Sequence, residues 1–208
     1  MAHTKAKNIQ SRIDNVASAA LIQRGRQICK GCAESGFSLV ELIVTLAILA
    51  ILAGVGAPGF MKLLSDSMLS SSTNDFVSSV FLARSEAVKR AMPAIVCPSS
   101  ASEQASAGCE AVDWSNGWIA FVDANGNGSR DVASADETLL VQQEALVSGF
   151  TVTTDAPMAT GVRFAADGTS ISAVGTPVSG SVTMEFNDEP SRVITISANG
   201  RVKTAVVH

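Results

Sequence analysis

The chain has 208 residues, a net charge of −4 and an apolar share of 47%, which is enough for one globular domain beside a long helix. Its two histidines are His3 and His208, it contains no Tyr, and the G-x-S-x-G, H-E-x-x-H and phosphate-loop patterns are all absent. We therefore expect neither an enzyme nor a cofactor.

Residues 1–36 form a basic N-terminal segment. They contain six Lys and Arg against two acidic residues, a net charge of +4, whereas residues 37–208 carry −8. Basic residues that flank an apolar span stay on the cytoplasmic side of a membrane, which predicts an internal N-terminus and an external C-terminal domain. Cys29 and Cys32 form a C-x-x-C pattern without a nearby histidine, and we assign no zinc site or redox function to them.

A 24-residue apolar run from Phe37 to Phe60 follows Gly36 and contains one charged residue, Glu41. A helix of roughly 20 apolar residues rises about 30 Å, the thickness of a bilayer core. A plain membrane anchor does not explain Glu41, because a carboxylate in lipid is costly without a partner. Two unit charges 4 Å apart attract by about 4 kcal/mol at an effective dielectric of 20, so a cation from a neighbouring chain would stabilise Glu41.

The helix is predicted to continue past Pro58 to about Met92, with a bend near Pro58 and an end before Pro93. Its second half carries an apolar stripe at spacings of 4, 3, 4 and 4, made by Phe76, Val80, Ala83, Ala87 and Ala91. The stripe is flanked by Val77, Phe81, Val88 and Met92. This amphipathic half should lie against a sheet.

The rest of the chain consists of short, β-branched-rich runs bounded by turn residues. The predicted strands are Ala94–Cys97, Trp118–Val122, Thr138–Gln143, Phe150–Thr154, Val162–Ala165, Ser181–Phe186, Arg192–Ser197 and Arg201–Val207. Asp167-Gly168 and Asn199-Gly200 are tight-turn dipeptides, and the second predicts a hairpin. The expected fold class is α+β, with a long N-terminal helix packed on an antiparallel sheet.

The segment Gly36-Phe37-Ser38-Leu39-Val40-Glu41 resembles the processing site of type IV pilins and of the pseudopilins of type II secretion. The resemblance implies that a prepilin peptidase cleaves between Gly36 and Phe37 and that Phe37 is then N-methylated. It also implies that Glu41 pairs with the N-terminal amine of a neighbouring subunit, and that Pro58 kinks the helix. The chain would then comprise a removed leader, residues 1–36; a long helix, residues 37–92, transmembrane in its first half; and a periplasmic β-rich domain, residues 93–208.

Later features resemble the GspH/FimT branch of minor pilins. They are Cys97, Cys109, the run Trp114-Ser115-Asn116-Gly117-Trp118 before Phe121-Val122-Asp123, and the closing Gly200-Arg201-Val202-Lys203. In an exported domain an oxidising periplasm would let Cys97 and Cys109 form a disulfide. The resemblance implies a minor pilin or pseudopilin of a type II secretion pseudopilus or a type IV pilus. Such a subunit is held in the inner membrane and then joins other subunits in a filament or at its tip.

Two other functions are considered. Some pilus members of this branch bind DNA through a C-terminal Gly-Arg-x-Arg region, and the candidate DNA contacts here are Arg192, Arg201 and Lys203. Lys203 replaces the second Arg and lacks its planar fork, and three phosphate contacts on an acidic domain give weak, salt-sensitive binding. We therefore do not expect DNA as a partner. The other alternative is an uncleaved, membrane-anchored periplasmic domain.

The run from Asp123 to Asp131 has the oxygen spacing of a calcium loop. Asp123, Asn125 and Asn127 alternate, and Gly128 takes the sixth position. The twelfth position is Ser134, where a calcium loop needs a bidentate Glu, and Asn-Gly turns form without metal. From the sequence we expect an ordinary turn and no metal.

Overall fold

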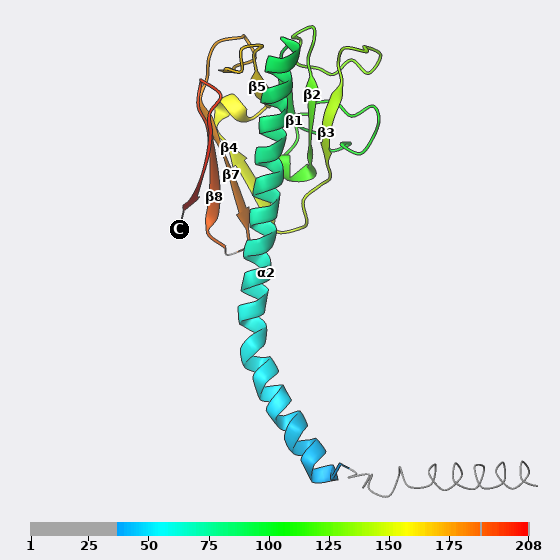
Figure 1. Ribbon diagram of the computed structural model, residues 1–208, viewed down its shortest axis with the longest axis vertical. Helices are drawn as coiled ribbons and strands as arrows, with labels where there is room; N and C mark the ends of the chain where they lie inside the picture. Colours follow the sequence, from blue (N-terminus) through cyan, green and yellow to red (C-terminus); the bar gives the residue numbers. More distant parts are fainter. Residues whose placement is uncertain (1–36, 188, 208) are drawn as a thin grey trace, which may run out of the picture. The chain divides into compact units, whose positions relative to one another are not determined.

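The computed structural model describes residues 37–187 and 189–207 (Figure 1). Within them, one 52-residue helix, α2 (Leu39–Arg90), precedes nine strands and two short 3-10 helices, η1 (Trp114–Asn116) and η2 (Ala156–Met158). The strands are β1 (Ala94–Pro98), β2 (Trp118–Val122), β3 (Leu139–Gln143), β4 (Phe150–Thr154), β5 (Val162–Phe164), β6 (Ser170–Ile171), β7 (Gly180–Phe186), β8 (Ser191–Ile196) and β9 (Val202–Val207). The start of α2, up to Ala53, belongs to a different compact unit from the part of the chain that begins at Gly54.

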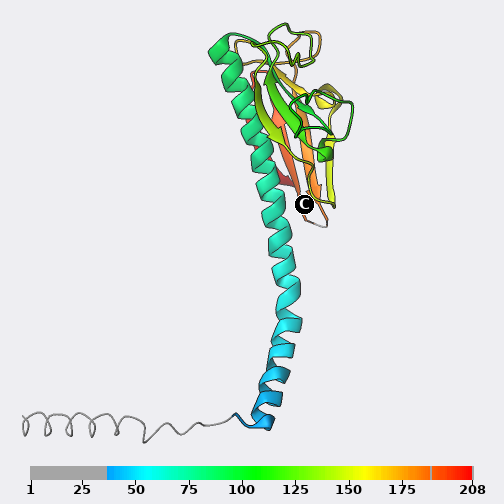
Figure 2. The same ribbon diagram turned by 90° about the vertical axis from the view of Figure 1, so that its right-hand side faces the viewer.

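The strands form two antiparallel sheets. The first has the order β3-β2-β1-β5-β6 and the second the order β4-β7-β8-β9. Both lie along the C-terminal part of α2, which covers one side of them (Figures 1 and 2). The expected α+β class with a helix on antiparallel strands is confirmed. The division into two sheets was not predicted, because β4 pairs with the distant β7 rather than with its neighbour β3.

The predicted helical stripe is the centre of the core. Phe76, Val80, Ala83 and Ala87 are all fully buried. They pack in one cluster with residues of both sheets, including Val96, Trp118, Ala120, Met184 and Ile194. The expectation that this half of α2 lies against a sheet is therefore confirmed. On the flank, Phe81 and Val88 remain about half exposed.

The helix ends two residues earlier than predicted. Ala91 has φ of 54°, a left-handed conformation that stops the helix at Arg90. The N–H of Met92 donates to the carbonyl of Ala87 at 3.2 Å, which satisfies one of the last helical carbonyls. Pro93 follows and prevents the helix from resuming.

Strands β1 and β2 are buried on both faces, which explains their uninterrupted apolar sequences. One face contacts α2, and the other forms a second cluster with Cys97, Ile119 and Phe121. Ala107 and Cys109, from the loop that follows β1, pack on this outer face. The predicted hairpin at Asn199-Gly200 is confirmed, since β8 and β9 pair along their full length. The two-residue strand β6 was not predicted, because it is too short to show a pattern.

Candidate assembly and ligand-binding sites

The start of α2 presents apolar side chains on all sides. Phe37 is 70% exposed and precedes the helix, and Glu41 lies in the first helical turn with its side chain exposed. The carbonyl of Ser38 accepts the N–H of Leu42 at 3.0 Å. An acidic residue in the first turn is favourable, because the N-terminal end of a helix carries partial positive charge. Gly36, the other half of the predicted cleavage site, lies outside the described residues.

Within the described residues, no single helix is long and apolar enough to cross a membrane. Two lengths of α2, Leu39–Gly54 and Gly59–Arg90, are bent relative to each other, and only together do they have the length and composition of a membrane span. Pro58 lies between these two lengths, and the kink assigned to it stays a prediction.

The two tryptophans of the Trp-Ser-Asn-Gly-Trp run pack against α2. The ring of Phe76 meets Trp114 and Trp118 edge to face, with ring centroids 5.3 and 5.4 Å apart. The indole N–H of Trp118 donates to the hydroxyl of Ser79 at 3.0 Å. Asp113 accepts the N–H of Ser115 and caps η1. The motif that resembled the GspH/FimT branch thus holds the sheet on α2.

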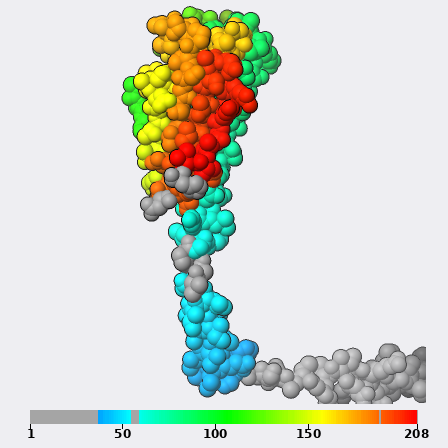
Figure 3. All heavy atoms as spheres, turned by 90° about the vertical axis from the view of Figure 1, so that its left-hand side faces the viewer, coloured from blue at the N-terminus to red at the C-terminus, as the bar shows by residue number. Residues whose placement is uncertain are grey.

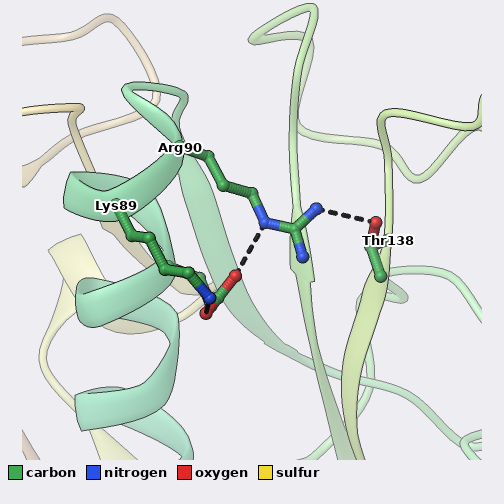
Figure 4. Close-up of polar contacts among 4 residues, drawn as sticks. Lys89, Arg90 and Thr138 are labelled. Carbon is green, nitrogen blue, oxygen red and sulfur yellow. Dashed lines mark hydrogen bonds and ion pairs between the residues drawn. The ribbon is translucent and has the colours of Figure 1, made fainter.

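Charged groups also secure the end of α2. Glu86 accepts hydrogen bonds from Lys89 at 3.0 Å and from Arg90 at 2.7 Å, and Arg90 donates onward to the hydroxyl of Thr138 beside β3 (Figure 4). The hydrogen bonds from Arg90 and Lys89 hold the pKa of the Glu86 carboxyl below its ordinary value.

Arg84 connects the helix to two tight turns. Its Nε donates to the carbonyl of Gly168 at 2.9 Å, and its Nη2 donates to the carbonyl of Asn199 at 3.1 Å. Gly200 has φ of 74°, and a Cβ there would collide with the Gly168 carbonyl and the Arg84 guanidinium. Only glycine fits this crossing without strain.

The predicted disulfide is confirmed. Cys97 and Cys109 are bonded, with Cα atoms 5.4 Å apart. Cys97 is the fourth residue of β1, and the bridge closes a loop over the outer face of the first sheet. Bridging residues 12 apart in the sequence restricts the unfolded chain, which stabilises the fold by about 3 kcal/mol on the chain-entropy model.

The three candidate DNA contacts do not gather in one patch. Arg192 forms an ion pair with Asp66 of α2 and donates to the hydroxyl of Ser70 at 3.2 Å. Arg201 and Lys203 are exposed at the start of the last strand, and Lys203 pairs in register with Thr195. Because Arg192 and Thr195 are three residues apart in β8, their side chains leave opposite faces of the sheet. The suggestion that Arg192 joins the other two is wrong.

Figure 3 shows the side of the molecule that includes β8 and β9, coloured orange to red. The sequence did not indicate Asp66 as the partner of Arg192, because 126 residues separate the two. Arg201 and Lys203 are the exposed cations that remain of the three candidate contacts, and the expectation that DNA is not a partner stays a prediction.

Two family descriptions match the sequence. "Type II transport protein GspH" matches residues 72–200, which covers more than half of the chain and includes the packed half of α2 and most of both sheets. "Prokaryotic N-terminal methylation motif" matches residues 32–57, which span the Gly36-Phe37 junction and the apolar start of the helix.

Two solved structures are similar. Both are crystal structures of the type IV minor pilin FimU of Pseudomonas aeruginosa, in two crystal forms, each 19% identical to this chain. One has a TM-score of 0.47 and the matched region covers 67% of this chain and 90% of FimU. The other has a TM-score of 0.43, with coverage of 66% and 92%. No curated protein matches the chain.

The GspH-family proteins are structural pilins and pseudopilins that are not known as enzymes, and their membership in filaments implies assembly with other pilin subunits. The methylation motif and the apolar helix that follows it agree with a pilin held at a membrane. The family match, the motif and the helix-on-sheet fold therefore agree, and the chain belongs to the GspH family of the type IV pilin and pseudopilin superfamily.

Proposed function

We propose that the chain is made as a prepilin, cleaved by a prepilin peptidase between Gly36 and Phe37 and N-methylated on Phe37. It then serves as a minor pilin or pseudopilin of a type II secretion pseudopilus or a type IV pilus. The observation that carries this proposal is the methylation motif over residues 32–57, joined in one chain to a GspH match over residues 72–200.

The exposed start of α2 supports an inner-membrane stage before assembly. Its large side chains from Phe37 to Leu52 are at least half exposed, and a surface of this kind is stable only in lipid or against other apolar helices. The net charge of +4 before Phe37 and −8 after it supports a cytoplasmic leader and a periplasmic C-terminal domain. In the filament, Glu41 would pair with the methylated amine of a neighbouring Phe37.

Mass spectrometry of the native protein tests processing. The first residue should be Phe37 carrying one methyl group. Glycine at position 36 has no side chain, which leaves the backbone before the cleaved bond accessible to a peptidase. A Gly36→Val variant should keep its leader, and it serves as the matched uncleaved control. Finding residues 1–36 on the wild-type protein recovered from filaments would contradict the proposal and favour an uncleaved anchor.

A deletion strain separates the two machineries. The matching family is described by type II transport, so we propose the secretion pseudopilus first. Loss of protein secretion with normal pili supports that assignment. Loss of pili with normal secretion places the subunit in a type IV pilus instead. Restoration by the wild-type chain, but not by Gly36→Val, would show that either phenotype depends on processing.

A further inference from the structure

The loop between β2 and β3 contains a buried carboxylate of which only one oxygen accepts a hydrogen bond from the described residues. Asp123 directly follows β2 and is 1% exposed. Its Oδ2 accepts the N–H of Gly128 at 2.9 Å. Its Oδ1 is buried and has no hydrogen-bond donor among the described residues. A buried charge without partners is costly, and proteins pair such groups or use them to bind metals.

A second buried carboxylate in the same loop also has one oxygen without a hydrogen-bond donor among the described residues. Glu137 is 3% exposed, its Oε2 accepts the N–H of Asp131, and its Oε1 has no donor in the described part of the chain. The N–H of Val122, the last residue of β2, donates to the carbonyl of Thr138, just before β3, at 3.0 Å. Asp123 and Glu137 therefore lie opposite each other where β2 and β3 diverge, each with one buried oxygen that has no donor among the described residues.

The neighbouring cations do not satisfy these oxygens. Arg163 packs against Gly128 and lines, with Asp123 and Gly126, a pocket of about 90 Å³. The ion pairs and hydrogen bonds of the described residues do not include one between Arg163 and Asp123. Arg130, also in the loop, donates instead to the carbonyls of Ala105 and Ala107.

We propose that this loop binds Ca²⁺, with Asp123 Oδ1 and Glu137 Oε1 as its two anchoring ligands. The sequence argued against a metal because Ser134 takes the twelfth position, but the fold brings in Glu137, three positions later. The described residues contain no group of three or more His, Cys, Asp or Glu placed to hold a metal, so amide, main-chain or water oxygens complete the coordination. Ca²⁺ accepts six to eight such oxygens in flexible geometry, whereas a site without His or Cys does not suit softer metals.

Titration calorimetry of the full chain in detergent, stripped with EDTA and titrated with CaCl₂, tests the proposal. We expect a dissociation constant of about 10⁻³ M or tighter, the range of extracellular calcium modules. Binding only to the folded state should raise the melting temperature by roughly 3–8 °C at about 10 mM Ca²⁺. MgCl₂ at the same concentration should give less than half of this rise, because Mg²⁺ demands stricter geometry.

Variants separate a ligand role from a structural one. Asp123→Asn and Glu137→Gln should each weaken Ca²⁺ binding at least tenfold. In EDTA they should melt at or above the wild-type temperature, because each change removes a buried charge that lacks a partner. The control is Asp113→Asn, an exposed acid whose capping bond to Ser115 an amide also makes, and it should bind Ca²⁺ as the wild type does.

Three outcomes would overturn the site. The first is a wild-type chain that shows neither heat nor a melting shift at about 10 mM Ca²⁺. The second is unchanged binding by the Asp123→Asn, Glu137→Gln double variant. The third is a loss of stability in the Asp123→Asn and Glu137→Gln variants that is the same with and without Ca²⁺, which would make both acids purely structural. The wild-type titration decides the matter if a variant fails to fold, and none of these results bears on processing or assembly.

Discussion

Residues 39–53 and residues 76–90 belong to the same helix, α2, but they bury their side chains to opposite extents. In the first stretch every side chain is exposed, including Leu46 and Leu49, which are more than half exposed. In the second, one face is fully buried against both sheets. Amphipathic packing explains the second stretch within a single chain. The first stretch is apolar apart from Glu41 and Thr45, and in the function proposed above its partners are lipid and other subunits.

The largest effect should come from Phe76→Ala. It removes a fully buried ring that contacts Trp114 and Trp118, and such truncations cost about 3–5 kcal/mol. Denaturant unfolding of the chain in detergent, followed by Trp fluorescence, measures the loss. Phe81→Ala, in the same stretch but 49% exposed, is the matched control and should cost less than about 1 kcal/mol. Similar losses in the two variants would mean that the packed face is assigned wrongly.

The next largest loss of stability is expected where the turns at Gly168 and at Gly200 meet beside Arg84. Gly200→Ala places an alanine in a left-handed backbone conformation, and its Cβ would collide with the Gly168 carbonyl. We expect a loss of about 2–3 kcal/mol in the free energy of unfolding. Gly175→Ala provides the control, because Gly175 has a similar φ of 82° with open space around it. It should lose only about 1 kcal/mol. Equal losses would show that the close approach to Arg84 contributes nothing.

The smallest effect concerns acid pH. Because the pKa of Glu86 is lowered in the folded chain, its contribution is complete above the unfolded pKa and is lost as the pH falls through the folded pKa. Glu86→Gln should therefore be less stable than the wild type at pH 7 and should lose less stability between about pH 6 and pH 3. Thermal melts across this range measure both slopes. A wild-type slope in Glu86→Gln would contradict the assignment.

The sequence predicted the parts of the fold that depend on local pattern. The spacing from Phe76 to Ala87 indicated the buried face of α2, and the runs Trp118–Val122 and Phe150–Thr154 matched β2 and β4 residue for residue. Asn199-Gly200 identified its hairpin because the turn chemistry is local. Hydropathy and the Gly36-to-Glu41 motif were likewise enough to indicate the family.

Features that depend on distant contacts were missed. The pairing of β4 with β7 and the ion pair between Arg192 and Asp66 join segments far apart in the chain. Glu137, the second ligand of the proposed calcium site, was overlooked because it lies outside the twelve-residue calcium loop, whose last position is Ser134. Ala91 extended the helical pattern by spacing, yet its left-handed backbone ends the helix. Periodicity cannot indicate such a backbone change in a residue other than glycine.

The claim that the first stretch of α2 finds its partner in another subunit is tested most directly by Glu41→Gln. The change removes the one charge of this stretch and keeps its shape, so insertion and cleavage should be normal. Co-purification with the major subunit should fall at least tenfold, the equivalent of about 1.4 kcal/mol, well within the pairing energy of two charges 4 Å apart. Asp75→Asn, an exposed acid on the packed part of the helix, should co-purify normally. Wild-type recovery of Glu41→Gln in assembled filaments would contradict the account.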